Sequence, residues 1–214
     1  MPFFAVLGIA AGLAGTLYNR SLLATVGMTE RFPGLRVEWR AAIVGAAVGA
    51  IAWCAPWLVG GGDGLAQQAL RGEGSFMVLP VLFFARLGLI ACSVGAGAPG
   101  GLLVPFLALG AKLGLWIGLL FALAFPGLGI EPAGFAVVGM AALFTAIVRA
   151  PVTAMVLVTE MTASQTMLLP MVAACFATLL VSARFSDLSI LEALKEHALA
   201  HRAPLDTVPS TARY

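Results

Sequence analysis

Long apolar stretches separated by short polar ones dominate the chain. Reading from one charged or strongly polar residue to the next gives apolar windows at 3–19, 41–62, 87–111, 113–130, 132–148 and 161–183. A helix that crosses a bilayer needs about 20 predominantly apolar residues. The windows at 41–62, 87–111 and 161–183 are long enough, and the others are borderline. This pattern predicts several membrane-spanning helices.

Two places in this pattern interrupt the predicted helices. Residues 95–101 read Gly-Ala-Gly-Ala-Pro-Gly-Gly, a composition that favours turning or extended backbone. Pro105 suits the first turn of a helix, so we expect a helix over 106–125 directly after the first break. The second break is predicted at Arg149–Pro151, because the residue before a proline is pushed out of the helical region. Met155–Thr162 is then expected to form a short half-span.

The first break has the chemistry of an anion site. Unwound backbone in a bilayer persists only where protein or a polar cavity satisfies its polar groups, and transporters place their sites at such interrupted segments. The first amides of the predicted helix, including those of Leu102 and Leu103, have no partner within it. Peptide dipoles make that end positive without a formal charge. We therefore predict an anion-binding end at Gly101, Leu102, Leu103 and Pro105; a bend needed only for helix packing is the alternative.

Composition supports a membrane protein. Of the 214 residues 61% are apolar and 10% are charged, whereas a soluble domain carries about 25% charged residues. Mean hydropathy is +1.01. The formal charge of +2 is too small for a nucleic-acid binder. Cys54, Cys92 and Cys175 are far apart in apolar runs, so we expect buried thiols and no disulfide, metal site or cofactor.

Charges beside the first apolar window indicate orientation. Residues 20–40 hold four arginines against Glu30 and Glu38, so the positive-inside rule predicts a cytoplasmic loop there. A signal peptide over 1–19 is the weaker alternative, because no Lys or Arg precedes the apolar run.

The C-terminal part has a different character from the rest. Ser186–Ala200 is predicted to be a short amphipathic helix at the membrane edge, opened by a Ser or Asp cap. The chain is therefore expected to comprise a transmembrane part at 1–185, this closing helix at 186–200 and a polar tail at 201–214.

Several runs resemble the CLC family of voltage-gated chloride channels and chloride/proton antiporters. Residues 95–110 resemble the family's second-half anion-site segment and 139–162 its later signature, with weaker similarity at 17–19, 84–86 and 169–171. The resemblance implies an all-α membrane fold with broken, re-entrant helices, built in the family from two inverted repeats. It extends to about His197 and matches the second repeat only.

Motifs of the family's first repeat have no counterpart in these 214 residues. These are a serine-bearing loop at the central anion and the Gly-Arg-Glu-Gly-Pro loop with the gating glutamate. The resemblance thus implies half a transporter, either a fragment or a chain whose partner supplies the other half. Leu103 stands at the family's phenylalanine position, and Leu191 at the place of the closing-helix tyrosine that donates to the anion. Both departures bear on anion preference and proton coupling.

The function implied by the resemblance is transport of chloride ion across a bacterial inner or plasma membrane, as a channel or an antiporter. No covalent chemistry is expected. A non-transporting membrane scaffold, or a split subunit of a full-length transporter, is the second hypothesis. The family forms homodimers, and 152–159 and 167–180 are expected to contribute an apolar dimer surface. We expect Arg86, Lys112, Arg149 and Glu160 to anchor or snorkel rather than line an ion path.

Overall fold

The computed structural model describes residues 2–30, 37–54, 62–95 and 103–185, and these residues form helices without any strand. The all-α prediction is confirmed. The α-helices are α1 (Pro2–Glu30), α2 (Val37–Cys54), α3 (Asp63–Leu70), α4 (Val78–Gly95), α5 (Leu103–Ala124), α6 (Pro132–Val148), α7 (Pro151–Thr162) and α8 (Leu168–Phe185). Two short 3-10 turns, η2 (Pro126–Leu128) and η3 (Gln165–Met167), complete the described elements.

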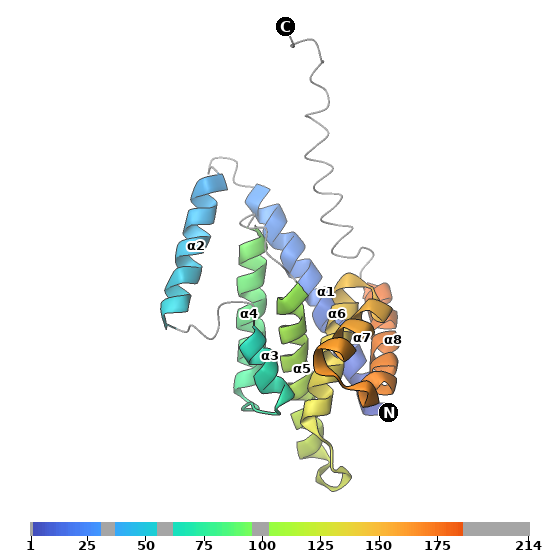
Figure 1. The fold of residues 1–214 in the computed structure, drawn as a ribbon. Coiled ribbons are helices and arrows are strands. Elements are labelled where there is room, and N and C mark those ends of the chain that lie inside the picture. The colour runs from blue at the N-terminus through green and yellow to red at the C-terminus, as the bar shows by residue number, and fades with distance from the viewer. Residues whose placement is uncertain (1, 31–36, 55–61, 96–102, 186–214) are drawn as a thin grey trace.

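Helices α5 and α6 form the centre of the bundle (Figure 1). Helix α1 runs obliquely against α6, α8 and α4, while α7 and α8 lie on one side and α3 and α4 on the other. Helix α2 stands apart, with few contacts to α4. Within the described residues, Pro2–Leu22, Val104–Ala124 and Gln165–Phe185 are long and apolar enough to cross a membrane.

The predicted helix boundaries agree with the structure best beside prolines. Helix α6 coincides with the apolar window at 132–148, and α5 matches the helix predicted over 106–125. The window at 161–183 contains a helix long enough to cross a membrane, as predicted, but α8 begins only at Leu168. Ala163 has left-handed dihedrals (φ 50°, ψ 25°), and a 3-10 turn follows before α8 begins. Hydropathy does not report backbone conformation, so the apolar run concealed this turn.

Two further sequence predictions need correction. The predicted cytoplasmic loop over 20–40 is helical over 20–30, because α1 continues to Glu30, with Leu22 fully buried along the way; its side of the membrane stays a prediction. Cys92 was expected to be buried and is exposed, because it lies on an outward face of α4. Cys175 is buried as predicted and accepts a hydrogen bond from Thr145 Oγ1 at 3.3 Å.

Glycine permits the closest helix contact in the molecule's core. A Cβ atom on Gly110 would lie 2.6 Å from the carbonyl oxygen of Gly139, and one on Gly139 would lie 2.7 Å from the Cα of Gly114. The backbones of α5 and α6 therefore touch, as small residues allow in membrane bundles. Since α5 also carries the predicted anion-binding end, this contact fixes where that end lies.

The turn after α7 gives a first testable prediction. A left-handed conformation costs an L-residue roughly 1–2 kcal/mol relative to glycine, and the exposed Ala163 packs no core atoms. Ala163→Gly should therefore stabilise the protein by about 1 kcal/mol, raising its melting temperature in detergent by a few degrees. Ala122→Gly, inside α5, is the control and should destabilise by about as much. A lower melting temperature for both variants would contradict the argument.

Candidate functional site

The N-terminus of α5 is the described part of the predicted anion site. The helix begins at Leu103, and Pro105 lies half-buried in its first turn, as predicted. The first N–H groups of a helix lack intrahelical acceptors, and Leu103 and Val104 are the first described residues of α5. Gly101, Leu102 and Leu191 lie outside the described residues. Their grouping with Leu103 and Pro105 stays a prediction.

The chain reverses direction between α4 and α5. The two helices pack against each other, and the end of α4 and the start of α5 lie towards the same end of the bundle (Figure 1). The segment that joins them, 96–102, is outside the described residues. Because α4 and α5 are separate helices that run in opposite directions, the predicted interruption of the 87–111 window is confirmed.

A buried tyrosine lies against the first turn of α5. The rings of Tyr18 and Phe106 meet edge to face, with centroids 5.2 Å apart and an interplanar angle of 80°. The Tyr18 hydroxyl is buried and has no hydrogen-bond partner among the described residues; the same holds for Asn19 Oδ1. Sequence reasoning missed both as site residues, although 17–19 is one of the runs with family resemblance.

Two basic side chains are buried within the helix bundle. Arg86 on α4 and Lys112 on α5 are 4% and 5% exposed, and their positive charges are near enough to repel each other. The Arg86 guanidinium also packs on Gly62, where a Cβ atom would lie 2.5 Å from Nη2. Sequence spacing could not bring these residues together, because their contact depends on how α4 packs on α5. They make the interior between α3, α4 and α5 electropositive.

The second predicted break is also present. Helix α6 ends where Arg149 takes left-handed dihedrals (φ 61°, ψ 30°), and the Arg149 N–H donates to the Thr145 carbonyl at 2.9 Å. Helix α7 begins at Pro151, four residues before the predicted half-span, and the Ala154 N–H donates to the Ala150 carbonyl at 3.0 Å. Capping hydrogen bonds thus satisfy part of the broken backbone. Glu160 lies exposed towards the end of α7.

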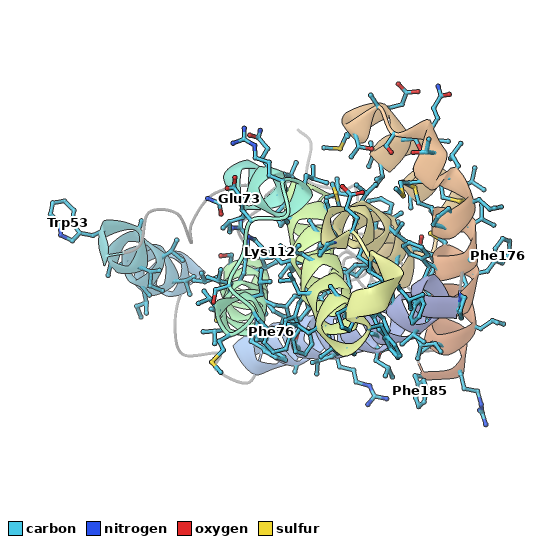
Figure 2. All side chains as sticks on the ribbon, turned by 90° about the horizontal axis from the view of Figure 1, so that it is seen from below. Trp53, Glu73, Phe76, Lys112, Phe176 and Phe185 are labelled. Atoms are coloured by element: carbon cyan, nitrogen blue, oxygen red, sulfur yellow. The ribbon has the colours of Figure 1, made fainter. Side chains whose placement is uncertain are left out.

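The outer sides of α7 and α8 present an apolar face. Figure 2 shows Phe176 pointing away from the bundle on the outer side of α8. The most exposed large side chains of this α7–α8 face are Val152 (67%), Val156 (56%), Leu169 (66%), Phe176 (58%) and Leu180 (75%). In a bilayer, such a face can contact lipid or another protein surface.

Comparison with known sequences gives consistent matches. A family model described as voltage gated chloride channel matches residues 1–183. The H(+)/Cl(-) exchange transporter ClcA of Yersinia pestis bv. Antiqua (strain Angola) is 38% identical over 202 residues, covering 92% of this chain and 42% of its own length. ClcA of Salmonella agona (strain SL483) is 39% identical over 181 residues, or 83% and 38% of the two chains. The chain thus spans less than half the length of these curated relatives.

Solved structures also match this chain over less than half of their own length. A slow cyanobacterial Cl-/H+ antiporter superposes with a TM-score of 0.86 at 32% identity, covering 92% of this chain and 46% of its own. A eukaryotic CLC transporter gives 0.77 at 25% identity, with 90% and 34% covered. A CLC-type fluoride/proton antiporter gives 0.71 at 21% identity, covering 86% and 44%, which supports the fold alone.

Proposed function

The chain belongs to the voltage gated chloride channel family, and on that premise we propose that it supplies half of a chloride pathway across a bacterial inner or plasma membrane. Its mode of action is that of a channel or a chloride/proton antiporter, with no covalent chemistry. The proposal rests on the interruption between α4, described to Gly95, and α5, described from Leu103, since the first amides of a helix have no acceptor within it. The amides of Leu102 and Leu103 then hold the anion, beside Gly101 and Pro105.

Amide donors suit an ion that must leave as well as enter. A hydrogen bond to a charged partner contributes about 1.5–3 kcal/mol, so a few such bonds offset the loss of hydration without trapping chloride. Lys112 lies more than two turns further along α5 and would contribute positive potential rather than a direct contact. Leu103, in place of the phenylalanine usual in the family, would change the apolar wall beside the ion.

A second half is needed for a complete pathway, in the same polypeptide or in a partner chain. Helix α2 supports this proposal. It is apolar over Ala42–Trp53, yet Ile43 and Trp53 are 58% and 91% exposed, and Cβ atoms on Gly45 and Gly49 would meet nothing within 4 Å. Among the described residues, this helix makes only a few contacts, with α4. We propose that the other repeat covers it.

Reconstitution tests the proposed transport. Proteoliposomes loaded with potassium chloride should release chloride, measured with a chloride-selective electrode, when this chain is present with a first-repeat partner. Release by this chain alone would show that it does not need that partner. Silence in both arrangements would contradict transport and favour the scaffold hypothesis, in which the chain only assembles with a full-length transporter.

We propose that the α7–α8 face forms a homodimer contact, as the family resemblance implies. Leu169→Trp puts a bulky ring into this face and should raise the dimer dissociation constant at least about tenfold, shifting the protein to monomers in detergent. Light scattering after size-exclusion chromatography measures the mass. Leu123→Trp is a matched control, since Leu123 is 68% exposed on α5 and outside this face. Dimers that persist in Leu169→Trp would refute the contact.

A further inference from the structure

Two adjoining cavities meet at Lys112. The first is a groove of about 200 Å³ between α1, α4 and α5, with apolar walls that include Leu13, Leu17, Phe84 and Trp116. The second, also about 200 Å³, lies beside the connection from α3 to α4; most of its lining is apolar, and we call it the polar cavity only because Gln68, Glu73 and Ser75 also line it. Lys112 and Leu79 line both cavities. The two cavities therefore adjoin, with a cationic side chain between them.

A bound anion would stabilise the buried positive charge of Lys112. The side chain is 5% exposed, and no carboxylate forms a salt bridge with it within the part of the chain that the structure describes. The neighbouring Arg86 adds a second positive charge and not a compensating one. Since an uncompensated buried ion costs several kcal/mol, buried lysines are almost always paired. An anion in the polar cavity would supply the missing charge.

Glu73 does not fill this role in the structure. It lines the polar cavity but is exposed, and it lies at the end of α3 while Lys112 lies further inside, between α3 and α5 (Figure 2). No salt bridge joins the two among the described residues. An exposed carboxylate is well solvated and gains little from a distant partner. Glu73 would instead compete weakly with any anion that reaches Lys112.

The apolar groove indicates that the bound anion carries a hydrocarbon chain. Leu13, Leu17 and Phe84 are each about half exposed (48%, 48% and 58%), so the groove opens on the outer surface of the bundle, where hydrocarbon surrounds a membrane protein. The polar cavity lies beside the start of α4 at Val78, an end of an apolar helix, which is the depth of lipid headgroups. Basic pockets at such positions suit anionic headgroups.

We propose that an anionic phospholipid binds at these two cavities, with its phosphate at Lys112, Gln68 and Ser75 and one acyl chain in the groove. The indole N–H of Trp116 is buried without a partner among the described residues and can donate to the ester carbonyl at the head of that chain. This site depends on the membrane location of the protein and not on chloride transport.

Titration of the purified protein with defined lipids tests the site. The protein in detergent is titrated with phosphatidylglycerol or phosphatidylcholine, and bound lipid is counted by native mass spectrometry. The wild type should bind phosphatidylglycerol at least about tenfold more tightly, as expected for one charge-assisted hydrogen bond. K112M keeps the apolar stem and should lose this preference. Arg184→Met, which removes an exposed cation on α8, should retain it.

Two more variants separate the headgroup from the acyl chain. Glu73→Gln removes the competing carboxylate and should raise phosphatidylglycerol affinity severalfold. Ala14→Trp fills the groove and should abolish binding of both lipids at this site, whereas Val6→Trp, on α1 outside the groove, should not. Chloride release, measured separately, reports the transport proposal and is not part of this comparison.

Several results would overturn the lipid site. One is a phosphatidylglycerol preference that survives in K112M. Another is inorganic phosphate raising the melting temperature as strongly as phosphatidylglycerol at equal concentration, since the acyl chain would then contribute nothing. The third is displacement of the lipid when the first-repeat half is co-expressed, because the groove would then be a protein interface.

Discussion

Gly114→Leu is expected to prevent folded protein from accumulating. A Cβ atom at position 114 would collide with the carbonyl oxygen of Phe135 and lie 3.0 Å from the Cα of Ala136, both backbone atoms of α6. Backbone cannot move aside as a side-chain end can, so α5 and α6 must separate. Their interface includes the buried Leu109 and Met140, and opening it should cost at least about 3–5 kcal/mol. Stability of 5–15 kcal/mol does not tolerate such a loss well.

Gly88→Leu is the matched control for this prediction. Gly88 also lies in an apolar helix, α4, but a Cβ atom there would meet nothing within 4 Å. Leucine favours helix over glycine by close to 1 kcal/mol, so this variant should keep or slightly raise the yield. The measurement is the amount of monodisperse protein on size-exclusion chromatography and its melting temperature. Equal behaviour of the two variants would show that backbone contact at Gly114 is unimportant.

The sequence predicts the helical elements well wherever local chemistry decides them. Proline at the start of α6 and α7 and the Arg149–Pro151 break set boundaries that side-chain sterics impose on any backbone. The sequence did not predict the turn at Ala163, because alanine gives no signal for a left-handed conformation. The sequence did not predict that Cys92 is exposed, because all faces of an apolar helix have similar residues.

For the candidate site, the sequence predicts the features that depend on neighbouring residues in the chain, but not the contacts between helices. Pro105 and the start of α5 at Leu103 follow from glycine and proline spacing. The packing of Tyr18 on Phe106 and of Arg86 near Lys112 depends on how α1, α4 and α5 are arranged, which no spacing rule supplies. The contact between α5 and α6 could be predicted in part. The sequence shows which glycines could allow close packing, but not which residues they pack against.

Gly101→Trp is expected to abolish chloride release from proteoliposomes. The release rate should fall by more than about tenfold, which brings it to the background rate. The proposed site holds the ion by backbone amides, and its selectivity comes from room for one dehydrated anion beside them. An indole at this position would occupy that room and leave the amides of Leu102 and Leu103 chemically unchanged. The effect should therefore appear in transport and not in folding.

Two measurements distinguish a blocked pathway from a damaged protein. Gly101→Trp should retain the wild-type elution volume and melting temperature, whereas a packing defect would change both. Gly127→Trp is the control, because Gly127 lies exposed in η2 with nothing within 4 Å of an added Cβ atom, and it should release chloride at the wild-type rate. If Gly101→Trp also releases chloride at that rate, the ion does not pass the start of α5, and the amides there serve only to end a helix.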